Sequence, residues 1–256
     1  MTHSTQKTVA TDVHGEFLAD ISLWNAVGNQ KAVNKLKVLV NQHHTDLSTK
    51  RYPVVKPILL IGHEDSGRTV LAYSYSNSLG CDQCFTASSS SLALGGRDIV
   101  DFLKQGTEFS SFYFSHAEKL SPYCNNIISA VLKDRLLRTR EIPGYREASI
   151  LPFYKLMMFA TTDITQVDPG LLKTVDLHLY LEPYSYSEIC EILKQRIKYL
   201  HWPVENENLL KNIAEISCET VSTAINVLGW TYRCARANGE DVITAEHVNE
   251  ALHLME

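Results

Sequence analysis

The sequence predicts an α/β fold in which helices sandwich a parallel sheet, followed by an all-helical subdomain. Short apolar runs typical of buried strands alternate with segments of helical periodicity as far as residue 182. Beyond Pro183, helical segments follow one another without an intervening strand. We therefore expect a flexible tail over residues 1–20, an α/β domain over 21–182 and a helical subdomain over 183–256.

The α/β domain begins with a predicted helix, a strand and a second helix. Residues 25–44 carry apolar side chains at helical spacing. PILLIG, residues 57–62, is an apolar run that ends in glycine, which is typical of a buried parallel strand. Residues 67–80 then form a predicted helix that ends at Gly80.

Further apolar runs predict strands at SSFYFS (110–115), YKLMMFATT (154–162) and HLYLEP (178–183). A helix is expected between the first two, with Ser121 as its cap and Pro122 in its first turn. The helical subdomain follows, with predicted helices over residues 184–200, 205–217, 221–239 and 244–254.

Charge and hydropathy argue against several classes of protein. The 256 residues carry a net charge of −5 and have a sequence pI of about 6.1, so no overall charge attracts nucleic acid. No apolar run is long enough to span a membrane, and the N-terminus lacks the features of a signal peptide. We therefore expect a soluble, cytoplasmic protein without a membrane partner. Cys81 and Cys84 have a C-x-x-C spacing, which we interpret as coincidence because no second ligand pair accompanies them.

The stretch IGHEDSGRTV, residues 61–70, resembles a phosphate-binding loop. Gly62, Gly67 and Thr69 have the spacing of the G-x-x-x-x-G-K-[ST] pattern, and the stretch lies between a predicted strand and a predicted helix. Arg68 occupies the lysine position. Two interpretations stay open: a nucleotide site without efficient hydrolysis, or a tight turn that the fold retains. Two acidic residues inside the loop favour the second.

Five blocks in the same order resemble AAA+ ATPases, and in particular the RuvB branch-migration motors. They are VGNQKAV (27–33), the loop with its flanking strand and helix (58–80), FYFSHAEKLSP (112–122), ILPFYKLMMFATT (150–162) and the C-terminal helices (217–252). The resemblance implies a P-loop AAA+ sandwich with a helical lid. It also implies a DNA-binding winged-helix domain after the lid, which we do not expect here because the sequence stops at Glu256.

The same resemblance identifies departures at the positions that carry catalysis. Arg68 replaces the Walker A lysine, and a planar guanidinium is not equivalent to a compact ammonium. Ser115 and His116 stand where the two Walker B acids hold magnesium and polarise water. Glu118 follows two residues later and need not face the same site.

Three further positions complete the comparison. Where the resemblance implies an arginine finger, the chain has Leu171 and Leu172, with Lys173 nearby. Ser222 stands at the sensor 2 arginine. Both sensor 1 threonines are retained, as Thr161 and Thr162.

From these losses we predict a catalytically inactive AAA+ relative, not an enzyme, that acts as a binding scaffold or as a subunit of a hetero-oligomer. The alternative is a nucleotide-binding switch or weak ATPase in DNA recombination, repair or replication. The candidate site is a vestigial nucleotide site, formed by Gly62, Gly67, Arg68, Thr69 and Thr161. We expect no cofactor, with ATP or ADP bound without tight magnesium as the alternative.

Partners follow from the same reasoning. We expect a protein partner, such as an active AAA+ ATPase or other subunits of a hetero-oligomer. Nucleic acid is a weaker expectation, which rests on ancestry and on the arginine cluster at residues 135, 138, 140 and 146. A solvated helix end and loop is the more common outcome for such a run of arginines. A metal site of His63 and His116 with Glu118 or Asp65 is a further alternative to a polar cleft.

Overall fold

The computed structural model describes residues 22–51, 55–88, 96–138, 150–152, 155–217 and 220–255. Side chains are described within these ranges except at 96–98, 138 and 150–152. Contacts divide the chain into two units. Within the described residues, one unit contains 22–26 and 31–182, and the other contains Val27–Gln30 and 183–255. The predicted tail over residues 1–20 lies outside the described residues.

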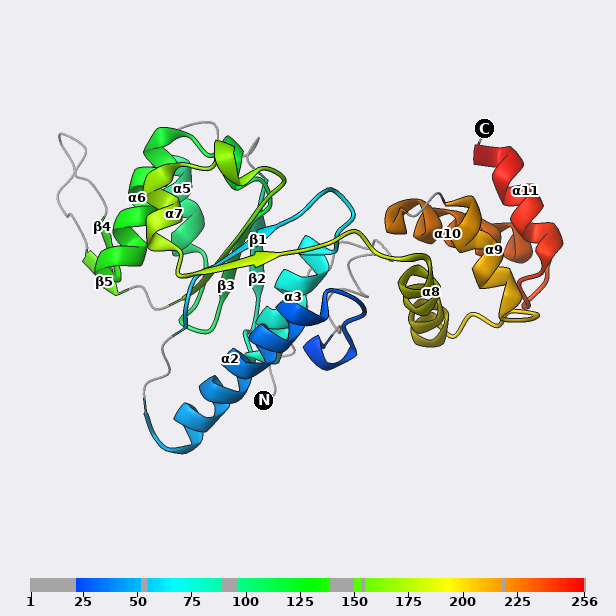
Figure 1. Ribbon diagram of the computed structural model, residues 1–256, viewed down its shortest axis with the longest axis horizontal. Coiled ribbons are helices and arrows are strands. Elements are labelled where there is room, and N and C mark those ends of the chain that lie inside the picture. The colour runs from blue at the N-terminus through cyan, green and yellow to red at the C-terminus, as the bar shows by residue number, and fades with distance from the viewer. Residues whose placement is uncertain are drawn as a thin grey trace, which may run out of the picture. The chain divides into compact units, whose positions relative to one another are not determined.

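A parallel five-stranded sheet forms the centre of the first unit, in the order β2-β3-β6-β1-β7 (Figure 1). Its strands are β1 (Ile58–Ile61), β2 (Cys84–Ala87), β3 (Ser111–Phe114), β6 (Leu156–Thr161) and β7 (Leu177–Tyr180). The predicted strands β1, β3, β6 and β7 are confirmed. β1, β3 and β6 are fully buried, as their uninterrupted apolar sequences require.

Helices cover both faces of this sheet. α2 (Gln30–Ser48) and α3 (Arg68–Ser78) pack on one face, and α5 (Gly96–Lys104), α6 (Pro122–Asp134) and α7 (Pro169–Thr174) pack on the other (Figure 1). Side chains alternate between the faces along each strand. On β3, Tyr113 belongs to the core beneath α2 and α3, while Phe112 and Phe114 belong to the opposite core.

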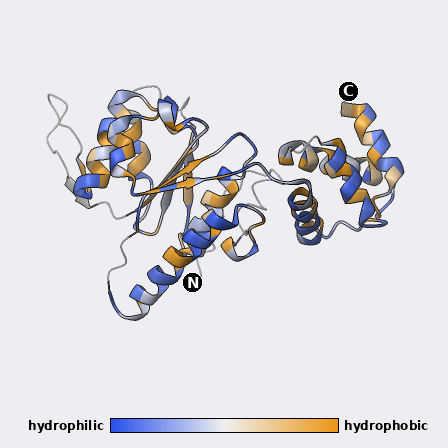
Figure 2. Ribbon diagram, in the orientation of Figure 1, coloured by the Kyte–Doolittle hydropathy of each residue, from blue (hydrophilic) through white to orange (hydrophobic). Residues whose placement is uncertain are grey.

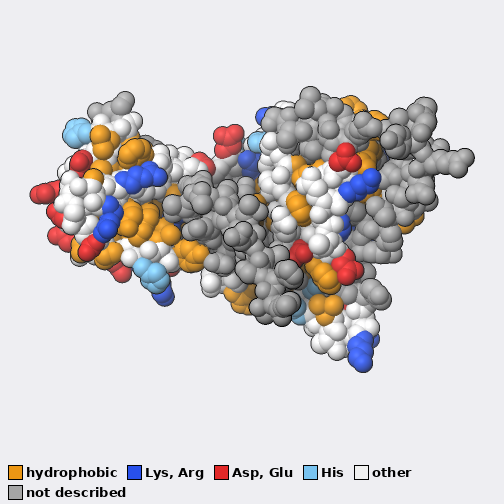
Figure 3. Space-filling model, turned by 180° about the vertical axis from the view of Figure 1, so that it is seen from behind, with side chains coloured by type: hydrophobic (Ala, Val, Ile, Leu, Met, Phe, Trp, Pro, Cys, Tyr) orange, Lys and Arg blue, Asp and Glu red, His pale blue; other side chains and the backbone are white. Residues whose placement is uncertain are grey.

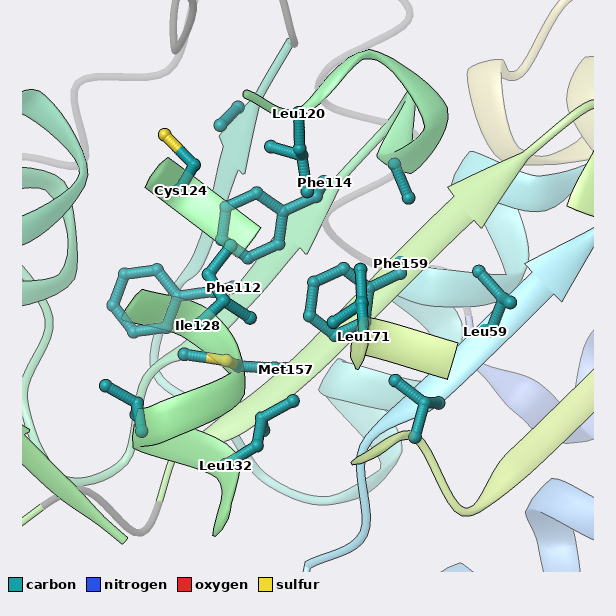
Figure 4. Close-up of a cluster of buried hydrophobic side chains, with 14 of the residues drawn as sticks. Leu59, Phe112, Phe114, Leu120, Cys124, Ile128, Leu132, Met157, Phe159 and Leu171 are labelled. Atoms are coloured by element: carbon teal, nitrogen blue, oxygen red, sulfur yellow. The ribbon is translucent and has the colours of Figure 1, made fainter. Parts of the chain in front are cut away.

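The core beneath α5, α6 and α7 is rich in aromatic rings. Phe114 and Phe159 stack with ring centroids 5.1 Å apart, and they lie among leucine side chains in Figure 4. Figure 2 shows the apolar character of the strands between the more polar outer faces of the helices. Strands with so much apolar surface need helices on both sides, which explains the sandwich.

Three short 3₁₀ turns accompany the sheet: η1 (Leu23–Asn25), η2 (Ala117–Lys119) and η3 (Ile164–Gln166). A small antiparallel sheet pairs β4 (Leu136–Arg138) with β5 (Ile150–Pro152). The sequence analysis predicted neither this pair nor β2. β2 is an edge strand whose residues are mostly part-exposed, so it lacks the apolar run that marks the other strands.

The second unit is helical. Its helices are α8 (Tyr186–Leu200), α9 (Asn208–Ile216), α10 (Val221–Ala237) and α11 (Ala245–Met255), which share one apolar core. Ser185 and Glu188 form a capping box that starts α8. Within the described ranges, none of the helices has the length and hydropathy needed to cross a membrane.

Candidate nucleotide site

The loop between β1 and α3 is held against the neighbouring strand. The N–H of Gly62 donates to the carbonyl oxygen of Thr161 at 3.1 Å. A Cβ atom on Gly62 would lie 2.6 Å from Oγ of Ser66 and 2.9 Å from the carbonyl oxygen of Leu181. The first glycine of the motif is therefore required by close packing of the loop itself.

The second glycine turns the chain into α3. Gly67 has a φ of 82°, in the left-handed region that favours glycine, and Asp65 also has a positive φ of 61°. The N-cap residue, Gly67, has no side chain to cap α3, so it provides no acceptor for the amide N–H groups of the first turn. Such a helix end attracts an anion.

Arg68 begins α3 with a half-buried side chain. Its Nη1 atom is shielded from solvent and has no hydrogen-bond partner among the residues that the structure describes. A guanidinium donor that is buried without an acceptor is costly, and a phosphate oxygen is a geometrically suited acceptor. Arg68 therefore adds a positive charge, with one buried donor that has no partner among the described residues, to the anion-attracting end of α3.

Thr69 contacts a residue that the sequence analysis did not single out. Oγ1 of Thr69 lies 3.2 Å from the phenolic oxygen of Tyr113 on β3. Burial raises the pKa of Tyr113 to about 12, so its hydroxyl stays neutral at physiological pH. The available signal was strand alternation, because Tyr113 lies two residues before Ser115 and faces the side of α3.

A histidine and a carboxylate meet just beyond β3. Nδ1 of His116 lies 3.2 Å from Oε1 of Glu118, whose side chain is only 6% exposed. The other oxygen, Oε2, is buried and accepts no hydrogen bond from the described residues. The sequence analysis left the orientation of Glu118 open, and the structure pairs it with His116.

The donor set does not fit a tightly held magnesium ion. In P-loop proteins that metal is held by the loop hydroxyl and by an acidic residue after a neighbouring strand. Here Oγ1 of Thr69 is paired with Tyr113, and Ser115 and His116 follow β3. Across the described ranges, no cluster of three His, Cys, Asp or Glu side chains is arranged to bind a metal. We assign no chemical step to a metal here.

Thr161 has its hydroxyl engaged in a local turn at the end of β6. It donates to the carbonyl oxygen of Asp163 at 3.0 Å and accepts from the N–H of Asp163 at 3.1 Å. Thr161 is buried, whereas the next residue, Thr162, is exposed. Thr161 therefore supports the loop through the hydrogen bond from Gly62 to its carbonyl oxygen, and Thr162 is the exposed one of the two threonines.

The structure also shows the surroundings of the other positions identified by resemblance. Leu171 is buried in the core beneath α7, and Lys173 is exposed in the last turn of that helix. Ser222 is exposed in the helical unit. In the arginine cluster, Nη2 of Arg135 donates to the carbonyl oxygen of Val55 at 3.4 Å. The side chains at 138, 140 and 146 lie outside the described residues.

The C-x-x-C pair has no reactive character. Cys81 and Cys84 are free thiols. Burial raises the pKa of both thiols, that of Cys84 to about 11, so both are protonated at neutral pH. Redox motifs instead depend on a lowered thiol pKa.

Comparison with known proteins identifies relatives. No protein-family model matches the chain. The chain is 25% identical over 237 residues to the Holliday junction branch migration complex subunit RuvB of Neorickettsia sennetsu, covering 92% of this chain and 69% of that protein. It is 27% identical over 207 residues to the same subunit of Campylobacter jejuni, covering 80% and 61%. The chain thus spans about two thirds of the length of these relatives.

A solved structure shows the same fold. The Thermotoga maritima RuvB Holliday junction branch migration motor superposes with a TM-score of 0.72 at 19% identity, over 93% of this chain and 73% of that chain. The prediction that this chain is an inactive relative and no enzyme is contradicted by these findings. The similar proteins are named as subunits of a branch migration complex and as its motor, and the substitutions at Arg68, Ser115 and His116 do not establish inactivity. The chain is a RuvB-like AAA+ module.

Proposed function

We propose that the chain is a nucleotide-binding AAA+ subunit of DNA recombination, repair or replication, which works as a nucleotide switch or as a weak ATPase. The observation that carries this proposal is the guanidinium of Arg68, whose buried Nη1 atom has no partner among the described residues. This atom belongs to the first residue of a helix that has no side-chain cap. An anion is the ligand that these two features share.

The nucleotide phosphates are proposed to bind at the end of α3. The backbone N–H groups after Gly67 and the side chain of Arg68 would contact them, and Thr69 would add its hydroxyl. Gly62 and Thr161 would maintain the loop through their backbone hydrogen bond. Because the donor set does not fit a tightly held magnesium, ATP or ADP is expected to bind about equally with and without that ion.

The test is calorimetric titration of the whole chain with ATP, ADP and a non-hydrolysable analogue, each with magnesium and with EDTA. We expect dissociation constants of about 1–100 μM, equivalent to about −8 to −5.5 kcal/mol. Replacing Arg68 by Ala removes a charge-assisted hydrogen bond and should weaken binding by at least about tenfold. Arg135→Ala is the control, since that guanidinium has a carbonyl partner elsewhere.

Two results would contradict the proposal. One is the absence of heat and of thermal stabilisation at millimolar nucleotide. The other is equal binding by the wild type and by Arg68→Ala, which would place the nucleotide elsewhere. Turnover of bound ATP, measured as released phosphate and compared with Thr69→Ala, separates a weak ATPase from a switch.

The proposed partners are other protein subunits, including an active AAA+ ATPase. Support comes from the names of the relatives, which describe them as subunits of a complex. We expect the chain to form an oligomer with such a subunit in the presence of ATP. Native mass spectrometry of the chain mixed with a RuvB relative would show mixed species, and separate species at all nucleotide concentrations would exclude this pairing.

The similarity to RuvB subunits of a Holliday junction branch migration complex also supports a proposed contact with DNA. Basic side chains form separate groups rather than one continuous surface on the face shown in Figure 3. A DNA contact on that face should therefore involve few phosphates. Titration of a four-way junction at several salt concentrations measures this, because the slope of log K against log salt is about −0.9 for each phosphate contacted. Binding that does not depend on salt would exclude a phosphate contact.

A further inference from the structure

The His116–Glu118 pair lies at the edge of the sheet where the proposed nucleotide site is formed. β3, β6 and β1 are neighbours in the sheet and run parallel, so the segments that follow them leave the same edge. Residues 62–67 follow β1, and His116 and Glu118 follow β3. In open α/β sheets, ligands bind outside the carboxyl ends of the strands. The pair is thus in the region where a terminal phosphate would lie.

His116 is more exposed than Glu118, as expected if the imidazole accepts a proton from water and the carboxylate orients it. The His116 side chain is 31% exposed, whereas that of Glu118 is 6% exposed. Nδ1 of the imidazole faces Glu118, and Nε2 makes no hydrogen bond within the described part of the chain. The carboxylate is thus the buried partner, and the imidazole is the partner that a water molecule can reach.

The contact with the buried carboxylate favours one tautomer of the His116 ring. With Nδ1–H donating to Oε1 of Glu118, the lone pair of the neutral ring lies on Nε2. Oε2 of Glu118 has no other hydrogen-bond partner in the described residues. Burying a carboxylate that has a single polar partner costs stability. Orienting a histidine is a common role of such carboxylates.

We propose that His116 is the general base of ATP hydrolysis in this chain and that Glu118 is its positioning residue. This inference rests on the proposed nucleotide site. The oxygen of a water molecule forms a bond to the γ-phosphorus while the bond from that phosphorus to the β–γ bridging oxygen breaks. The bridging oxygen leaves with the bonding electron pair on ADP. The water proton moves to Nε2 of His116, and the negative charge of Glu118 stabilises the resulting imidazolium.

The test compares ATP turnover and nucleotide affinity in matched variants. His116→Gln should lower kcat by about 10²-fold or more, the usual contribution of a general base, and leave the dissociation constant of ATP within about twofold. Glu118→Gln should lower kcat by about tenfold or more with the same unchanged affinity, and Glu118→Asp should recover part of that loss. Free imidazole in the buffer should partly restore turnover to His116→Ala.

The chain provides an internal control for these substitutions. Glu240 lies 3.7 Å from Nε2 of His247 in the helical unit, so Glu240→Gln also removes a carboxylate beside an imidazole. It should change neither kcat nor affinity. Thermal unfolding of each variant identifies any loss that arises from misfolding, and the imidazole rescue is independent of such losses because both samples contain the same variant.

The outcomes separate this inference from the proposed function. No nucleotide binding by the wild type overturns both. Binding with no measurable turnover overturns the role of His116 and leaves a nucleotide switch. Turnover that His116→Gln and Glu118→Gln do not change overturns the pair alone and leaves a weak ATPase with another base.

Discussion

Oγ1 of Thr69 lies 3.2 Å from the phenolic oxygen of Tyr113, which joins the first turn of α3 to a buried strand of the sheet. Thr69 is exposed, whereas Tyr113 is 1% exposed. The two hydroxyls therefore differ in what they lose when the bond is removed. The exposed one can bind water instead, and the buried one cannot.

This asymmetry predicts different losses of stability from two single substitutions. Tyr113→Phe keeps the ring in the core and should cost less than about 1 kcal/mol of unfolding free energy. Thr69→Val leaves a buried phenol without its partner and should cost about 1–3 kcal/mol. Urea unfolding of both variants and of the double variant measures the difference. Losses that are additive in the double variant would show that the bond is not formed in solution.

Removing the charge of Arg68 should have opposite effects on the stability of the protein and on nucleotide binding. Its Nη1 atom is buried without a partner among the described residues, and a buried donor without an acceptor costs stability. Arg68→Met keeps the stem and removes the charge, and should raise the unfolding free energy of the free protein by about 0.5–2 kcal/mol. The same variant should lose the thermal stabilisation given by ATP. A variant that is less stable without nucleotide would show that the guanidinium is already satisfied.

Replacing glycine by alanine should have opposite effects on stability at two positions of the chain. Gly62→Ala places a Cβ atom 2.6 Å from Oγ of Ser66 and 2.9 Å from a backbone carbonyl, and should cost about 1–3 kcal/mol. Gly229 lies within α10, and a Cβ there meets nothing within 4 Å. Gly229→Ala should therefore stabilise the protein by about 0.5–1 kcal/mol. Denaturant midpoints of the two variants should move in opposite directions, and a shift of Gly62→Ala toward higher denaturant would refute the packing argument.

The raised thiol pKa of Cys84 predicts that the folded protein loses stability in alkali. Burial raises the pKa of this thiol from 9.0 to about 11. Between these values the unfolded chain loses the proton while the folded chain keeps it, so the folded state binds more protons and its stability falls as pH rises. Cys84→Ala should show a shallower fall between about pH 9 and 11. Unfolding free energies at several pH values measure the slope, and parallel slopes would indicate an accessible thiol.

The predictable part of the fold depended on burial patterns in single segments. β1, β3 and β6 are buried on both faces, so each appears in the sequence as an uninterrupted apolar run. The α6 helix was predicted from its cap, and Ser121 does accept a hydrogen bond from the N–H of Cys124. β2 was not predicted because its short sequence, CFTA, is mostly part-exposed and contains no apolar run, and its identity depends on pairing with β3.

The candidate site was predictable only in its backbone. The spacing of Gly62 and Gly67 marks the loop, since a close approach to Ser66 and a positive φ each require glycine. The pairing of His116 with Glu118 was not predictable, because a carboxylate two residues away turns toward the imidazole only if the chain leaves the strand in a 3₁₀ turn. The engagement of the Thr161 hydroxyl by Asp163 is likewise a property of the turn after β6.

Local sequence thus determined the strands β1, β3, β6 and β7, the helices with clear apolar periodicity and the place of the loop, because apolar periodicity, caps and glycines act within a few residues. Tertiary structure decided which residues meet: the side chains of Thr69 and Tyr113 across 44 positions, and the backbones of Gly62 and Thr161 at the ends of adjacent strands. Such contacts depend on the order of strands in the sheet and on the face to which each side chain points. Strand order arises from the packing of the whole core, so no single segment encodes it.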